Sequence, residues 1–429
     1  MMEAGGVADE ANVPLRLMNR NFLLLWQGQG VSQLGNQAFA VAMAFWVVDK
    51  TGSASLMGLL LAMRSLPMVL LAPVGGAVAD RFSRLRVLIL CDVIAGGAMV
   101  GLSIAMFSGR FSVPILVAML FAVGLLSGVI SAFFQPALGS SIPDLVPAER
   151  LSAANSLNQF SVQGAALVGQ GVGGVLYRLL GGPQLFLFNG LSFFFSAVCS
   201  AFIRMPPMPQ TSRRERLGLA ASVRQFARTI REGFTYVLQT PGLLGYIAAP
   251  ASYNFFSFAV FVLLPFFVRI NLNAGAEWYG FLLAAMSAGA VGGFIIAGLV
   301  RFTGAARARF VTALIVVAPV PMLTVGFVHR PAIALVMSFG LGALIGMINV
   351  NLMTLLQANT PAELRGRVIG LWTALVSALT PLGMALGGFA GDLTGKNIPL
   401  VYTTCGAINL LITALTVSRS STQRYLSRA

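Results

Sequence analysis

Residues 76–86 read Gly-Ala-Val-Ala-Asp-Arg-Phe-Ser-Arg-Leu-Arg, a short charged stretch between two long apolar runs. A helix needs about 20 consecutive apolar residues to cross the hydrocarbon core of a bilayer, and both flanking runs are that long. Ten more runs of this kind lie along the chain. The twelve expected spans are 22–48, 56–79, 87–107, 113–138, 156–180, 184–204, 242–268, 279–300, 310–328, 332–356, 368–390 and 399–418.

The composition of the 429 residues agrees with a protein that lies mostly in lipid. Hydrophobic residues make up 57% and charged residues 10%, whereas a typical soluble domain carries about 25% charge. The mean hydropathy is +0.84. Backbone groups in lipid must bond within the protein, so only helices or closed barrels can span it. Because unbroken apolar runs favour helices, we predict an all-α integral membrane protein with twelve transmembrane helices.

The distribution of Arg and Lys predicts how these helices are oriented. With a cytoplasmic N-terminus, 21 of the 28 basic residues fall on the cytoplasmic side and six on the outer side, while Arg64 lies inside a span. Cytoplasmic loops carry such an excess, so both termini are expected in the cytoplasm. The first span is expected to be an uncleaved anchor. The net charge of +15 then faces anionic lipid, and nucleic acid is not an expected partner.

The sequence repeats itself at the scale of half the chain. A shift of 214 places Gly169, Gly173 and Gly174 on Gly383, Gly387 and Gly388. A shift of 222 places Gly58, Leu60, Leu61, Ala62 and Ser65 on Gly280, Leu282, Leu283, Ala284 and Ser287. We therefore expect two six-helix repeats, 1–204 and 242–429, as in transporters whose site lies between two repeats. The connecting segment 205–241 has an apolar stripe that predicts an amphipathic helix on the inner membrane surface.

Several spans carry glycines four residues apart, a spacing that lets membrane helices approach closely. These glycines are Gly97/Gly101, Gly124/Gly128, Gly289/Gly293, Gly342/Gly346 and Gly383/Gly387/Gly391. We expect them to form smooth packing faces along which helices can slide or rock.

The sequence carries no motif for nucleotide or metal chemistry. The only lysines, Lys50 and Lys396, do not lie in a Gly-x-x-x-x-Gly-Lys-Ser/Thr loop, so ATP is not the expected energy source. The three cysteines lie far apart within spans, and His329 is the only histidine. Neither a disulfide nor a metal site is indicated. We expect no cofactor and no enzymatic activity.

The charged loop resembles the signature loop of the major facilitator superfamily of secondary transporters, and the resemblance covers nearly the whole chain. It implies a latch in which a carboxylate and arginines tie the cytoplasmic helix ends together in the outward-facing state. The matching residues are Gly76, Asp80, Arg81, Arg84 and Arg86. Leu85 replaces a basic residue common in the family, and the loop after the eighth span has arginines but no acid. An alternative role for the arginines is to anchor the loop to lipid.

Two further regions are similar to exporters of this superfamily. In the fifth span, residues 169–174 read Gly-Gln-Gly-Val-Gly-Gly and resemble the Gly-Pro-x-x-Gly-Gly exporter signature, with Gln170 in place of the proline. In and after the first span, residues 25–29, 32–35 and 51–54 resemble the subgroup of enterobactin-type siderophore exporters and macrolide efflux proteins. The resemblance implies efflux of a natural product or drug across the inner membrane of a bacterium.

Polar residues within the spans are candidates for a central substrate cavity. Amides of the first span recur at a spacing of four, which places them on one face of a helix. The candidates are Gln29, Ser32, Gln33, Asn36, Gln37, Gln135, Ser252, Tyr253, Asn254, Ser257, Asn349, Asn351, Trp372 and Ser377. Amides and aromatic rings suit a moderately polar organic molecule. For any single residue, an interhelical hydrogen bond is the alternative.

Two charged residues lie within spans, where ionisable groups are costly and usually functional. Arg64 could bind an anionic substrate, pair with a carboxylate, or extend its side chain to the membrane surface. Asp92 could take up a transported proton or pair with nearby arginines.

The expected function is secondary active export of a drug, siderophore or other small organic molecule by proton antiport and alternating access. The expected partners are the substrate, protons and membrane lipids, and the protein is expected to work as a monomer. The alternatives are an importer with the same fold and a non-transporting receptor or assembly factor.

Overall fold

A computed structural model describes residues 17–204, 228, 231–232, 234–300, 302 and 304–427, without the side chains at 72, 73, 80, 305, 362, 363 and 367. Within these ranges the protein is helical and has no strand. The helices of the N-terminal half are α1 (Arg20–Thr51), α2 (Ala54–Arg81), α3 (Arg84–Phe107), α4 (Val113–Leu145), the short η1 (Ala148–Arg150), α5 (Leu151–Leu180) and α6 (Gly182–Ala201).

The C-terminal half has the same number of spans, of which two are interrupted. The seventh span consists of α8 (Leu243–Val262), α9 (Leu264–Phe266) and η3 (Phe267–Asn271). The ninth span consists of α11 (Gly304–Val317), α12 (Val320–Thr324) and η4 (Val325–Phe327). The other helices are α10 (Ala276–Leu299), α13 (Pro331–Asn359), α14 (Ala362–Leu393), α15 (Ile398–Val417) and the short α16 (Ser420–Leu426).

The positions of the twelve spans agree with the prediction, while several of their ends do not. The interruptions in the seventh and ninth spans occur next to Pro265 and Pro319, because proline cannot donate the backbone hydrogen bond that continues a helix. The predicted fourth span ends at 138, but α4 continues to Leu145. Apolar length marks only the part of a helix inside lipid, so a polar last turn is missed.

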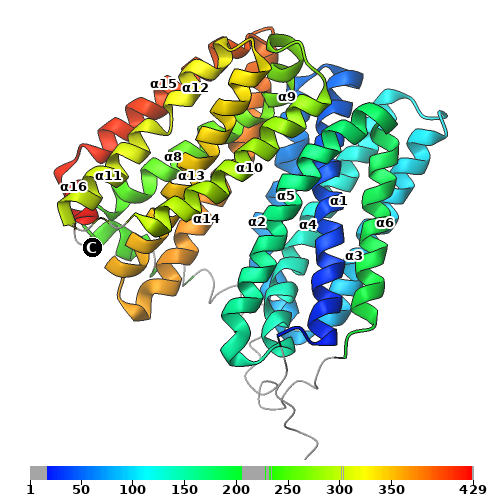
Figure 1. The fold of residues 1–429 in the computed structure, drawn as a ribbon, viewed down its shortest axis with the longest axis horizontal. Coiled ribbons are helices and arrows are strands. Elements are labelled where there is room, and N and C mark those ends of the chain that lie inside the picture. Colours follow the sequence, from blue (N-terminus) through cyan, green and yellow to red (C-terminus); the bar gives the residue numbers. More distant parts are fainter. Residues whose placement is uncertain are drawn as a thin grey trace, which may run out of the picture.

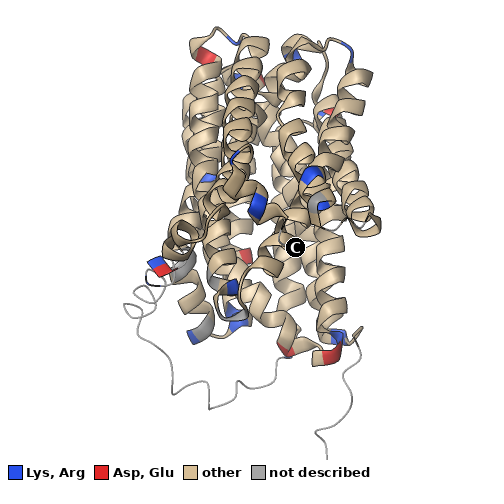
Figure 2. Cartoon of the chain, turned by 90° about the vertical axis from the view of Figure 1, so that its left-hand side faces the viewer, with Lys and Arg blue, Asp and Glu red and all other residues tan. Residues whose placement is uncertain are grey.

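Eleven helices of the described chain are long and apolar enough to cross a membrane. The remaining span, α5, has 30 residues, which suffices in length, but its serines, asparagines and glutamines lower its hydropathy. Lys, Arg, Asp and Glu are few along the helices, and most of the ribbon is formed by uncharged residues (Figure 2). The protein is therefore a multi-pass membrane protein, as predicted.

The packing of the helices repeats from one half to the other. In the N-terminal half α1 packs on α5 and α6, and α2 packs on α4; in the C-terminal half α8 packs on α14 and α15, and α10 packs on α13. The contacts between the halves are also repeated, since α5 packs on α10 and the equivalent helix α14 packs on α2. The predicted arrangement in two six-helix repeats is confirmed.

The two halves meet at one end of the molecule and diverge toward the other (Figure 1). We call the end where Asn19, Arg204 and Leu426 lie the linker end, and the opposite end the far end. One buried apolar cluster near the far end combines residues of both halves, such as Phe45 and Tyr279. Toward the linker end each half has its own cluster. The structure is thus closed at the far end and separated at the linker end.

The predicted amphipathic helix of the linker falls mostly outside the described residues. Its final part, 234–239, is helical. Val237 is fully buried in the cluster of the C-terminal half, whereas Phe234 is exposed. Arg228 forms an ion pair with Glu232 over 2.7 Å. The side of the helix that carries Val237 therefore packs on protein, and contact of this segment with lipid stays a prediction.

Most of the predicted glycine pairs do form packing faces. Gly289, Gly293, Gly342 and Gly346 bring α10 and α13 together, because a Cβ atom at any of them would collide with the facing backbone. The pair Gly97/Gly101 is an exception, since no atom lies within 4 Å of a Cβ built at either position. That part of the prediction was wrong. Helix α3 packs on α6 through the neighbouring Gly96 instead, one position around the helix.

Candidate substrate cavity and the contacts between the halves

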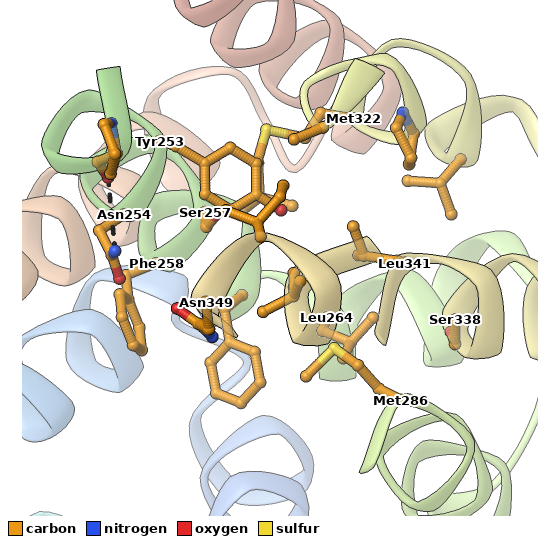
Figure 3. A pocket seen from close by; sticks show the side chains of 18 of the residues that line it. Tyr253, Asn254, Ser257, Phe258, Leu264, Met286, Met322, Ser338, Leu341 and Asn349 are labelled. Carbon is orange, nitrogen blue, oxygen red and sulfur yellow. Dashed lines mark hydrogen bonds between the residues drawn. The ribbon is translucent and has the colours of Figure 1, made fainter. Parts of the chain in front are cut away.

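A cavity of about 490 Å³ lies within the C-terminal half. Its walls come from α8 to α15, and Gln170 of α5 is the one residue of the N-terminal half among the described residues that line it. Its volume falls in the range of about 300–1,000 Å³ that is usual for drug-sized ligands. Figure 3 shows Tyr253 and Ser257 of α8 across the cavity from Leu341 of α13.

The cavity lining is apolar with several polar groups and no charge. The polar lining residues are Gln170, Tyr253, Asn254, Ser257, Ser338, Asn349, Trp372 and Tyr402. The described lining contains no Asp, Glu, Lys, Arg or His. Three methionines, Met286, Met322 and Met337, contribute flexible apolar surface. This lining suits an uncharged amphipathic molecule.

Sequence reasoning found part of this lining. Five predicted candidates line the cavity: Tyr253, Asn254, Ser257, Asn349 and Trp372. Their role in substrate binding stays a prediction. Tyr402, Ser338 and the three methionines were missed, because such residues are common in any apolar helix. One signal was available, since Met286 is the repeat counterpart of Arg64.

The candidates from the N-terminal half do not line this cavity, and their part in substrate binding stays a prediction. They are Gln29, Gln33, Asn36, Gln37, Arg64 and Gln135. Gln29 is buried and donates from Nε2 to Oγ of Ser196 on α6 over 3.1 Å. The side chains of Asn36 and Asn189 contact each other over 3.5 Å. Several of the amides of α1 thus form interhelical hydrogen bonds, the alternative that the sequence left open.

Gln170, the residue in place of the signature proline, connects the two halves. Its side chain hydrogen-bonds Gln37 of α1 over 2.9 Å and Ser287 of α10 over 3.3 Å. It also lines the cavity. A polar link therefore runs from the N-terminal half to the wall of the candidate substrate site.

The glycines of the exporter-like motif explain how α5 lies so close to both neighbours. Gly169 and Gly173 face α1, where a Cβ atom would lie 2.8 Å from Cβ of Gln37 or from Cα of Ala38. Gly174 faces α10, where a Cβ atom would collide with the carbonyl oxygen of Ala276. The motif thus places α5 against its own bundle and against the opposite half at once.

The same contact occurs a second time at equivalent positions. Gly174 packs on Gly280 between α5 and α10, and Gly388 packs on Gly58 between α14 and α2. The shifts of 214 and 222 carry each pair onto the other. The repeat seen in the sequence therefore marks the two close approaches that join the halves near the far end.

Polar contacts close the far end next to these glycines. Arg178 of α5 pairs with Glu277 of α10 over 2.8 Å, and Asp49 of α1 lies 3.6 Å from Arg269 of η3. At the other interface, the carboxylate of Asp392 on α14 caps the N-terminus of α2. It accepts hydrogen bonds from Oγ of Ser53 and from the backbone N–H groups of Ala54 and Ser55, over 2.8, 3.0 and 2.8 Å.

The residues of these far-end contacts also occupy equivalent positions in the two repeats. The shift of 214 carries Asp392 onto Arg178, and the shift of 222 carries Glu277 onto Ser55. Equivalent positions therefore form an ion pair at one interface and a carboxylate cap at the other. A carboxylate at a helix N-terminus is favourable because it bonds free N–H groups and faces the positive end of the helix dipole.

The predicted latch residues lie at the linker end, where the halves are apart. Arg84 pairs with Asp144 and bonds the carbonyl oxygen of Ser140, both on α4 of its own half. Arg86 is exposed, and no atom lies within 4 Å of a Cβ built at Gly76. Arg81 ends α2, and the side chain of Asp80 is outside the described residues. In this state, Arg84 holds α3 to α4, and its part in a latch between halves stays a prediction.

The two charged residues inside spans have different surroundings. Arg64 is half-buried, and its guanidinium carbon lies 6.0 Å from the centre of the Phe39 ring. Asp92 is 2% exposed and lies beside Ser196, and its Oδ2 has no hydrogen-bond partner in the described chain. Within that part of the chain no carboxylate pairs with Arg64 and no basic group pairs with Asp92.

Comparison with known proteins agrees with this architecture. The sequence profile of the family described as "Transmembrane secretion effector" matches residues 11–427. Macrolide efflux protein A of Streptococcus pyogenes is 24% identical over 378 residues, which are 88% of this chain and 90% of that protein. The enterobactin exporter EntS of Citrobacter koseri is 28% identical over 382 residues, which are 86% of this chain and 80% of that protein.

A solved structure shows the same fold. The bacterial homologue of the iron transporter ferroportin, in its inward-facing state, is 15% identical and superposes with a TM-score of 0.71 over 93% of this chain and 99% of that chain. Together with the match of the family profile, this likeness confirms the predicted fold and the predicted class of protein. The chain belongs to the transmembrane secretion effector family of the major facilitator superfamily and is a membrane transporter, not an enzyme.

Proposed function

We propose that this protein exports small organic molecules across the inner membrane of a bacterium by alternating access, in exchange for protons. The observation that carries the proposal is the cavity of about 490 Å³ next to an interface that is closed at the far end and separated at the linker end. The separation of the halves at the linker end would let substrate reach such a site from that side only. Rocking of the halves that separates these glycine contacts would open the far end and close the linker end.

The direction of transport is inferred from charge and from relatives. The excess of basic residues on the linker side supports a cytoplasmic location of that side, from which the described state would take up substrate. Two similar proteins are by name a macrolide efflux protein and an enterobactin exporter. These observations together support export of a drug-like or siderophore-like molecule. We propose that a monomer surrounded by lipid carries it out.

Asp92 is the proposed proton carrier. A buried carboxylate without a basic partner is costly in its charged form, so this group would exchange a proton as its surroundings change. The thiol of Cys91, the residue before Asp92 on α3, is a neighbouring titratable group. Ser196 lies beside Asp92 and accepts from Gln29 of α1, which gives the carboxyl group a polar connection to a helix that packs on α5.

Transport in everted membrane vesicles tests the function. Vesicles that contain the protein are expected to accumulate at least one of erythromycin, ethidium and griseofulvin when a proton gradient is imposed, and a protonophore is expected to abolish this. Vesicles without the protein are the control. Accumulation that needs ATP but no gradient would contradict the mechanism. Uptake only into right-side-out vesicles would favour an importer, and binding without any transport would favour a receptor.

Removing the charge of Asp92 is expected to uncouple transport. Asp92→Asn keeps the size of the side chain but cannot release a proton, so gradient-driven accumulation should fall at least tenfold. Exchange of substrate at equal concentrations on both sides should remain, because it needs no net proton movement. Glu149→Gln, at an exposed acid of the same half, is the control. Normal accumulation by Asp92→Asn at normal expression would exclude this residue as the carrier.

Removing the amide of Gln170 is expected to slow transport while leaving the fold intact. Gln170→Met keeps the length of the side chain but loses the hydrogen bonds to Gln37 and Ser287. Two neutral hydrogen bonds of about 0.5–1.5 kcal/mol each correspond to roughly a tenfold change in the equilibrium they bias. The transport rate is the measurement, and Gln159→Met, at an exposed glutamine of the same helix, is the matched control. Equal rates for both variants would exclude a role for the link.

Arg64 and the latch residues complete the proposal. Because Arg64 is the repeat counterpart of the lining residue Met286, we assign it to substrate handling from the N-terminal half. Asp80 with Arg81, Arg84 and Arg86 would close the linker end in the opposite state of the cycle.

A further inference from the structure

Four polar atoms around the cavity have no hydrogen-bond partner within the described chain. They are the hydroxyl groups of Tyr253, Ser257 and Tyr402 and Nε1 of Trp372, and all four are buried. The hydroxyls of Tyr253 and Ser257 lie close to each other but not in hydrogen-bond geometry. Buried polar groups in proteins are nearly always bonded. Such a concentration around one cavity indicates that a bound molecule supplies the partners.

The four groups have a common chemical character. The indole nitrogen of Trp372 can only donate, and the three hydroxyl groups can each donate one hydrogen bond. They come from three helices, α8, α14 and α15, so they would contact a ligand from several sides. The ligand that satisfies them carries several hydrogen-bond acceptors, such as carbonyl, ester or ether oxygens.

The rest of the lining fixes the charge of the ligand. No charged side chain is present among the described lining residues, and a charged ligand would lose its hydration without gaining a counter-charge. The remaining walls are apolar, and Met286, Met322 and Met337 can adapt to ligands of different shape. The site therefore disfavours both cations and anions.

We propose that the cavity of the C-terminal half binds uncharged, oxygen-rich amphipathic molecules, with Tyr253, Ser257, Trp372 and Tyr402 as donors to their oxygens. This inference rests on the proposed transport function and names the substrate class of that site. Specificity then follows from oxygen positions and not from charge.

Binding to the purified full-length protein in lipid nanodiscs tests the substrate class. The probes are radiolabelled griseofulvin, which is neutral and carries several ketone and ether oxygens, and ethidium, which is a cation. Griseofulvin is expected to bind at least tenfold more tightly than ethidium. Tighter binding of ethidium would overturn the proposal, while transport of ethidium in everted vesicles would still support the function. Binding and transport of neither probe would count against both.

Removal of single hydroxyl groups tests the donors themselves. Tyr253→Phe and Tyr402→Phe are each expected to weaken griseofulvin binding about fivefold, the usual effect of one neutral hydrogen bond. Tm should stay equal or rise, because each change removes a buried group that has no protein partner. Unchanged affinity in both variants would overturn the assignment of donors.

A matched tyrosine separates binding from folding. Tyr246 is as buried as Tyr402, but its hydroxyl donates to the carbonyl oxygen of Leu352 and its side chain does not line the cavity. Tyr246→Phe is expected to lower Tm and to leave griseofulvin binding unchanged. In the opposite direction, Ser257→Asp adds a carboxylate to the wall and is expected to raise ethidium affinity at least tenfold while griseofulvin binding falls. No gain for ethidium would contradict control of specificity by the uncharged wall.

Discussion

Replacing Gly388 by valine is expected to stop transport and to hold the far end of the protein open. A Cβ atom at this position would collide with the backbone carbonyl oxygen of Ala54 and approach Cα of Gly58 to 3.1 Å. Backbone atoms cannot turn aside as a side chain can, so α14 and α2 must separate. The state in which the far end is closed then becomes inaccessible, and the transport cycle stops at that step.

Distances between spin labels at the far end measure this opening. Labels at Arg110→Cys and Arg330→Cys, two exposed positions on opposite halves, should move apart in Gly388→Val, and accumulation in everted vesicles should fall to background. Cys91, Cys199 and Cys405 are replaced by alanine beforehand. Gly97→Val is the control, because no atom lies within 4 Å of a Cβ at Gly97. A folded Gly388→Val variant with unchanged distance and normal transport would contradict the role of this contact.

The second large effect is expected from Asp392→Ala, which removes the cap on the N-terminus of α2. One carboxylate accepts three hydrogen bonds from the opposite half. A hydrogen bond to a charged group contributes about 1.5–3 kcal/mol, so loss of even one net bond shifts the equilibrium roughly 10- to 150-fold toward the far-end-open state. Substrate uptake from the linker side should slow accordingly, since the receptive state is less populated.

Spin-label distances at the same two positions quantify that shift. Asp392→Asn retains one acceptor oxygen, and asparagine is itself a good helix cap, so it should lie between the parent and Asp392→Ala. Thr394→Ala is the control, because the Thr394 hydroxyl bonds only carbonyl oxygens of its own helix. If Asp392→Ala and Thr394→Ala behave alike, the cap does not stabilise the closed far end.

The sequence predicted the spans and the repeat because both are patterns along the chain. They can be recognised without knowing which helices are neighbours. Apolar length is set by the bilayer, and the glycines at 58, 174, 280 and 388 are required wherever backbones touch. The shifts of 214 and 222 align these glycines as repeat equivalents, and the structure shows that they are the contact positions between the halves. The shifts did not indicate which glycines touch each other, because a shift relates equivalent positions and not neighbours.

The candidate site was harder to predict, since polarity alone does not show which way a side chain points. Gln29, Asn36 and Asn254 are all amides within apolar spans. Gln29 nevertheless bonds Ser196, while Asn254 lines the cavity. Asp392 lies at a span end like many surface acids, and nothing in one sequence reveals that α2 begins beside it. The sequence does not distinguish Tyr402 from the other residues of the apolar helix α15, because only the structure shows that its hydroxyl lacks a hydrogen-bond partner among the described residues.

The divergence of the two bundles in Figure 1 makes the molecule wider at the linker end than at the far end. In a bilayer, this wedge takes up more area in one leaflet than in the other. When the far end opens and the linker end closes, the excess area moves to the opposite leaflet. The balance between the two states is therefore coupled to lateral pressure, and lipids with small head groups in one leaflet would act on it as an applied force, with no binding site of their own.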